Sequence, residues 1–221
     1  MAHMPRSPSE NLVWVLVSAV TNVAGLPVVA LNWRRRRIFE AVIMAYTFLT
    51  SFMYHLCDSL EYKGNVGFWL SEGQWHRQDN VGAIMCFVVF FIHLADFKNK
   101  DHEDACKYLF LCWVILLQEK SPWDLSFTLG PIALSLCLWL GKRFVVDGGT
   151  FAPCHPQYLK YAVGWHFIGA ICFYKGLDEH TDPYRMFHGG WHMFTGIAGY
   201  YDWQLLHFKK EKMKADDDDH P

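Results

Sequence analysis

Long apolar runs separated by short charged connectors organise this 221-residue chain. A helix that crosses a membrane needs about 20 mostly apolar residues to span a hydrocarbon core of about 30 Å. Seven runs approach that length and predict transmembrane helices over residues 11–33, 38–57, 79–96, 107–119, 124–141, 157–174 and 184–205. The pattern therefore predicts an all-α, polytopic integral membrane protein in which one seven-helix bundle forms a single domain over residues 1–221. A charged tail over residues 206–221 follows the last helix.

The distribution of basic residues predicts the orientation, because cytoplasmic segments of membrane proteins retain Lys and Arg. If the N-terminus lies outside, the cytosolic connectors and tail hold fourteen of the twenty Lys and Arg residues, including those in 34–37 and 209–214. The opposite connectors and the N-terminus hold the other six. We therefore expect an extracytosolic N-terminus and a cytosolic C-terminus, in the plasma membrane or a membrane of the secretory pathway.

Composition agrees with this class, because 52% hydrophobic residues and ten tryptophans are high values for a soluble domain. Mean hydropathy is only +0.05, since charged connectors offset the apolar runs. A net charge of -2 with scattered basic clusters argues against nucleic-acid binding. The first ten residues lack the pattern of a cleavable signal peptide, so we expect the first apolar run to insert and remain. Seven cysteines form no CxxC pair, and the odd number leaves one thiol free or paired between chains, so a homodimer is an open alternative.

Polar residues interrupt the apolar runs at three places, and ionisable groups at membrane depth require partners. Ser51 and His55 lie four residues apart near the end of the second predicted helix, hence on one face. Asp79 opens the third, and His188 and His192 lie four residues apart early in the seventh. In the expected topology all three places lie toward the extracytosolic side. We therefore expect these side chains to meet at one depth of the bundle.

Three imidazoles and a water match an open, catalytic zinc site, whereas a structural zinc site uses four protein ligands. His55, His188 and His192 are therefore the expected metal ligands. Such histidines also commonly hydrogen-bond to water or backbone, and a haem held between two helices could use them or His166, although no CxxCH motif is present. Gly189 stands where the metalloprotease motif HExxH has glutamate, which argues against proteolysis.

The combination of Ser-x3-His, Asp and His-x3-His in a seven-helix chain resembles the CREST superfamily of membrane hydrolases. That superfamily includes alkaline ceramidases, adiponectin and progestin receptors and myomaker-like proteins. The stretch YHLCD at residues 54–58 is most similar to the myomaker-like family and its GPI-trimming phospholipase relatives. The resemblance implies that His55, His188 and His192 hold zinc, while Asp79 and Ser51 bind or orient the water.

Two functions follow from these residues as expectations. The first is a zinc-dependent lipid hydrolase that cleaves an ester or amide bond of a membrane lipid at the extracytosolic leaflet, with Asp79 as the proton acceptor. The alternative is a myomaker-like fusion protein with a structural zinc and a cavity that holds lipid. Asp79 can also cap a helix, and Asp58 is a second candidate base or a solvated loop residue. The presence of both Asp79 and Ser51 favours the hydrolase.

Overall fold

The computed structural model describes residues 7–60, 70–150, 154–178, 180 and 182–206. These residues are predominantly helical, and the extended pairing within them is one isolated bridge between Cys154 and Leu206. The prediction of an all-α chain is therefore confirmed. The predicted tail at 206–221 lies outside the described residues except for Leu206.

The helices follow the predicted apolar runs closely. The first long segment is continuous but changes its winding, from α1 (Pro8–Trp14) through a π-helical turn η1 (Val15–Ala19) and a 3-10 turn η2 (Val20–Gly25) to α2 (Leu26–Arg34). The remaining helices are α3 (Ile38–Ser59), α4 (Glu72–Ala95), α5 (Lys100–Lys120), α6 (Leu125–Gly141) with the π-helical turn η3 (Lys142–Val146), α7 (Pro156–Gly176) and α8 (Met186–Leu205).

Three of these segments are long and apolar enough to cross a membrane by length and composition, namely Pro8–Arg34, Glu72–Ala95 and Leu125–Val146. The other long helices carry more polar residues, such as Asp202 in α8 and Lys107 in α5. A crossing by all seven predicted helices therefore stays a prediction.

Two predicted helix starts are wrong because both helices begin with polar turns. The third predicted helix begins at Glu72 instead of residue 79, and the preceding Ser71 forms a capping box in which its backbone N–H donates to Gln74 Oε1 at 2.9 Å. Asp79 therefore lies two turns inside α4 and does not cap it. The fourth predicted helix begins at Lys100 instead of residue 107, after Asn99 accepts a hydrogen bond from the Asp101 backbone at 2.8 Å.

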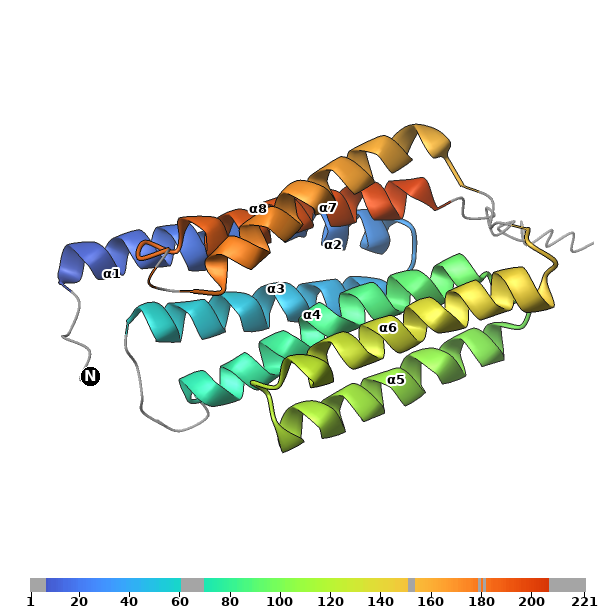
Figure 1. Cartoon of the computed structure of the whole chain (residues 1–221), viewed down its shortest axis with the longest axis horizontal. Coiled ribbons are helices and arrows are strands. Elements are labelled where there is room, and N and C mark those ends of the chain that lie inside the picture. The colour runs from blue at the N-terminus through green and yellow to red at the C-terminus, as the bar shows by residue number, and fades with distance from the viewer. Residues whose placement is uncertain (1–6, 61–69, 151–153, 179, 181, 207–221) are drawn as a thin grey trace, which may run out of the picture.

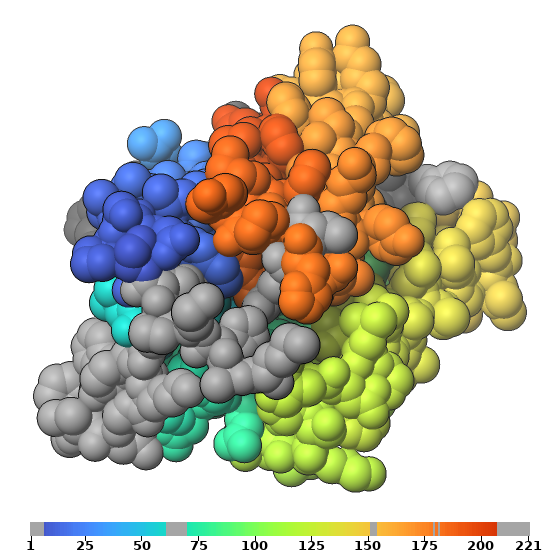
Figure 2. All heavy atoms as spheres, turned by 60° about the vertical axis from the view of Figure 1, so that its left-hand side comes forward, coloured from blue at the N-terminus to red at the C-terminus, as the bar shows by residue number. Residues whose placement is uncertain are grey.

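The helices run along one common direction, with α1, α2, α7 and α8 on one side and α4, α5 and α6 on the other (Figure 1). Helix α4 is central, since it packs against α3, α5 and α6. Its residues Ile84, Met85, Val88, Val89 and Ile92 are all fully buried. The N-terminal segment packs along α8, so the first and last helical segments of the described chain lie side by side (Figure 2). This packing positions the start of α8 beside the end of α3.

A buried charge cluster joins α3, α4 and α5 at the end of the bundle opposite the predicted metal site. Lys107 is 1% exposed, and its Nζ lies 2.6 Å from both Glu40 Oε1 and Glu103 Oε1. His93 Nε2 lies 2.7 Å from the same Glu40 oxygen. A buried lysine is tolerated only when its charge is paired, so removing either partner would be costly, and the ion pairs link the three helices.

Candidate metal centre

Three histidines converge where the end of α3 meets the start of α8. His55 is 2% exposed on the last turns of α3, and His188 and His192 lie on successive turns of α8. The Nε2 atom of His55 lies 3.3 Å from that of His188 and 2.9 Å from that of His192. The structure therefore brings together all three predicted metal ligands, which are distant in the sequence.

The donor set is compatible with zinc. Zinc–imidazole bonds of about 2.0–2.1 Å in tetrahedral geometry separate the nitrogens by about 3.3 Å. One of the two separations equals that value and the other is shorter by about 0.4 Å. Charged rings this close would repel one another strongly, so the arrangement favours neutral imidazoles, the form that binds metal. Three nitrogens leave one tetrahedral position for water or a substrate oxygen.

Glycines allow α8 to approach its neighbours at this point. A Cβ atom on Gly189 would lie 2.0 Å from the carbonyl oxygen of Val17 in η1. A Cβ atom on Gly176 of α7 would lie 2.8 Å from the backbone nitrogen of His188. No side chain fits at Gly189, so the glutamate of the HExxH motif could not be accommodated there. The local sequence His-Gly-Gly-Trp-His thus combines two donors with the close packing that orients them.

Ser51 and Asp79 lie beside each other but outside the histidine set. Ser51 is 2% exposed on α3, one turn before His55, and its buried hydroxyl has no hydrogen-bond partner among the described residues. Asp79 on α4 is partly buried and close enough to interact with that hydroxyl. Among the described residues, the histidine trio forms a candidate metal group that includes neither of them. Their participation in chemistry therefore stays a prediction, and their position places a carboxyl next to a buried hydroxyl.

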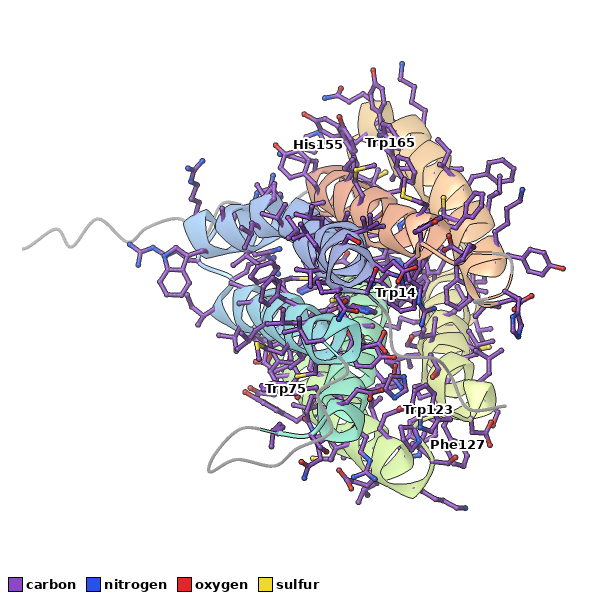
Figure 3. The ribbon with its side chains drawn as sticks, turned by 90° about the vertical axis from the view of Figure 1, so that its left-hand side faces the viewer. Trp14, Trp75, Trp123, Phe127, His155 and Trp165 are labelled. Carbon is purple, nitrogen blue, oxygen red and sulfur yellow. The ribbon has the colours of Figure 1, made fainter. Side chains whose placement is uncertain are left out.

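A buried arginine that sequence reasoning missed lies at the start of α8, one turn before His188. Arg185 precedes α8, has a left-handed backbone with φ of 56°, and is 9% exposed. Its guanidinium lies 5.0 Å from the ring centre of Trp14, a residue labelled in Figure 3, and 3.8 Å from Asp58. Asp58, the second candidate base, is thus partly buried and paired instead of a free loop residue. Asp182 accepts a hydrogen bond from the His188 backbone at 2.9 Å and holds the first turn of α8.

The other histidine considered from the sequence, His166, lies elsewhere. Its Nε2 is 2.7 Å from Asp202 Oδ2, in a pair that joins α7 to α8. A second group with metal-binding residue types, Glu40, His93 and Glu103, already contains a cation, because Lys107 Nζ contacts both carboxylates. The three-histidine cluster is therefore the stronger candidate metal site in the described part of the chain.

Cysteines contribute no disulfide, since all seven are free thiols. Three of them are exposed, namely Cys112, Cys137 and Cys154. The structure describes one chain, so the homodimer stays an open alternative.

Comparison with known proteins supports the membrane assignment. Transmembrane protein 8B of Homo sapiens and of Mus musculus are each 27% identical to this chain over 197 residues. The match covers 86% of this chain and 40% of each relative, so the chain spans less than half the length of these relatives. Together with the apolar helices, this similarity identifies an integral membrane protein. A family model described as a protein of unknown function, DUF3522, matches residues 10–193, a range that includes all three histidines. The chain therefore belongs to the DUF3522 family.

Proposed function

We propose that this chain is a zinc-dependent integral membrane hydrolase of the CREST type that cleaves an ester or amide bond of a membrane lipid. The observation that carries the proposal is the convergence of His55, His188 and His192, with Nε2 separations of 2.9 and 3.3 Å about His55. A buried hydroxyl lies one helical turn before His55, at Ser51, and the Asp79 carboxyl of α4 lies beside that hydroxyl. Donor atoms and a proton acceptor at one end of a bundle are the parts that metal-assisted hydrolysis requires.

The proposal places this centre at the extracytosolic leaflet. All seven long helical segments would cross the membrane, with the N-terminus outside and the C-terminus in the cytosol. The end of α3 and the starts of α4 and α8 then lie on the same side. The fourteen-to-six division of basic residues supports that orientation. A lipid would therefore enter with its polar headgroup at the histidine end of the bundle.

Each residue has a distinct part in the chemistry. Zinc in such a site supplies a nucleophilic water at neutral pH and polarises the scissile carbonyl. The Asp79 carboxylate would accept a proton from the attacking water and return it to the leaving group. The Ser51 hydroxyl would donate a hydrogen bond to Asp79 and keep that carboxylate oriented. Arg185 and Trp14 would cover the centre and limit access of bulk water.

Asp79→Asn tests this division of roles in the purified protein. The substitution keeps the side-chain shape and all three imidazoles, so zinc content and thermal stability should match the wild type. Cleavage of lipids in mixed phospholipid and sphingolipid vesicles, followed by mass spectrometry, should fall about 10²–10⁴-fold, the size of a general acid–base contribution. Glu119→Gln is the matched control, since it removes an exposed carboxylate at the same end of the bundle that has no part in the proposed chemistry.

Full activity of Asp79→Asn with zinc bound would contradict the hydrolase. That result would favour the alternative, a myomaker-like fusion protein in which zinc is structural and the bundle holds lipid. Cleavage lost equally in the Glu119→Gln control would also contradict the specific role of Asp79.

A further inference from the structure

His76 lies beside the candidate metal centre and is not one of its predicted residues. It stands on α4 three residues before Asp79, hence on the same face of that helix. His76 is 9% exposed, and its Nδ1 is buried with no hydrogen-bond partner among the described residues. Burying a polar nitrogen without a hydrogen bond costs free energy, so the missing partner of His76 Nδ1 calls for an explanation.

Aromatic side chains from two other elements hold the His76 ring. It stacks on Trp123 with ring centres 3.7 Å apart and an angle of 13° between the planes. It meets Tyr54, the neighbour of His55, edge-to-face at 4.8 Å. Trp123 comes from the connector between α5 and α6 and is labelled in the end-on view of Figure 3. Packing therefore fixes the plane of the imidazole and leaves its nitrogen edge for polar contacts.

The surroundings of His76 connect it with the metal centre. The ring centre of Tyr54 lies 4.8 Å from that of His76 and 4.5 Å from that of His55, so one aromatic side chain contacts both His76 and a predicted metal ligand. His76 is not a member of the histidine trio whose donor atoms converge. A ring that is near the centre, fixed in orientation and not a ligand is suited to contact whatever the metal binds.

We propose that His76 is a substrate-contacting residue whose Nδ1–H donates a hydrogen bond to an oxygen of the lipid group bound at the histidine centre. The inference rests on the proposed function, because it requires a metal-bound ligand between His76 and the three histidines. A fixed donor aimed at a developing negative oxygen acts without reorganisation and is effective in a site shielded from water. This role accounts for a buried nitrogen that has no hydrogen-bond partner among the described residues.

Three substitutions separate hydrogen bonding from packing. His76→Phe keeps a flat ring against Trp123 and removes the donor. His76→Asn removes the ring and carries an amide nitrogen on Cγ, where histidine carries Nδ1. His76→Gln carries its amide nitrogen one bond farther from the backbone and controls for the position of the donor. If a donor at the position of Nδ1 is what matters, only the His76→Asn variant should bind the ligand as the wild type does.

The test uses the full chain in detergent with cobalt in place of zinc, and it needs no turnover. Acetohydroxamate, a small chelator with a carbonyl oxygen, is titrated while the visible absorption of cobalt reports its binding. All variants should bind cobalt as the wild type does. Loss of a hydrogen bond to a charged oxygen should weaken acetohydroxamate about 10- to 100-fold in His76→Phe and His76→Gln. His76→Asn should remain within about threefold of the wild type.

Wild-type affinity in His76→Phe, or equal weakening in His76→Phe and His76→Asn, would overturn the role of His76. Loss of cobalt from the His76 variants alone would also overturn it, because the residue would then be a ligand. Failure of the wild type to bind cobalt would instead refute the metal centre and the proposed function with it.

Discussion

Gly189→Ala tests whether close packing of α8 against η1 positions the metal ligands. The added Cβ would lie 2.0 Å from the Val17 carbonyl oxygen, whereas real Cβ contacts below 3.0 Å are essentially never seen. The start of α8 must therefore move by about 1 Å, and it carries His188 and His192. Displacement of that size in a pre-organised site is enough to disturb its function by about 100-fold.

The cost in stability follows from two opposing effects. Overpacking costs typically about 1–3 kcal/mol, and the upper end applies because the obstacle is backbone and cannot rotate away. Alanine gains about 1 kcal/mol over glycine inside a helix. The net destabilisation is about 2 kcal/mol, which lowers the melting temperature by about 4–8 °C for a chain of this size. Gly189→Ala should also reduce zinc content.

Gly199→Ala in the same helix is the matched control. Its Cβ would meet Val28 at 3.7 Å, which is ordinary van der Waals contact, so the helix gain of up to about 1 kcal/mol should remain. Thermal unfolding in detergent and metal analysis of both variants give the comparison. If the Gly189→Ala protein has the same melting temperature and the same zinc content as the Gly199→Ala protein, the packing argument is refuted.

Three further predictions concern other parts of the molecule. Lys107→Met should destabilise the fold by about 3–5 kcal/mol in chemical unfolding, because Glu40 and Glu103 would lose their shared cation. Lys100→Met, at a side chain that is 62% exposed, should cost less than about 1 kcal/mol, and equal losses would contradict the burial of the cluster. In intact cells an antibody should reach a tag at the N-terminus, but a tag after residue 214 only after permeabilisation; the reverse result would move the centre to the cytosolic leaflet. His166→Asn should leave zinc content unchanged, because His166 pairs with Asp202 at 2.7 Å away from the trio, and lost zinc would require a different ligand set.

Hydrophobic runs predicted the helices well because apolar length is a strong signal of a membrane helix. The errors occurred at polar helix ends, which hydropathy does not detect. Local capping signals were present at both places, since Ser71 and Gln74 have capping-box spacing and Asn99 precedes an acidic turn. Reading these signals would have placed Asp79 inside α4 from the sequence alone.

The histidine trio was predictable for a different reason. Helical spacing put His188 and His192 on one face, and the expected alternation of helices through the bilayer predicted that His55 lies at the same end of the bundle. Which faces meet across the bundle was not predictable from spacing. That information was needed to find Arg185 buried at the start of α8, His76 beside the centre and Val17 against Gly189. His76 left one signal, a polar residue one turn before Asp79 on the same helix face.

Metal content tests the central claim most directly. Purified wild-type protein, His166→Asn and the double variant with His188→Ala and His192→Ala are analysed together by elemental mass spectrometry. The account predicts about one zinc per chain in the wild type and in His166→Asn, and little or none in the double variant, because it removes two of the three converging nitrogens. Zinc that is absent from the wild type, or retained in full by a folded double variant, would contradict it.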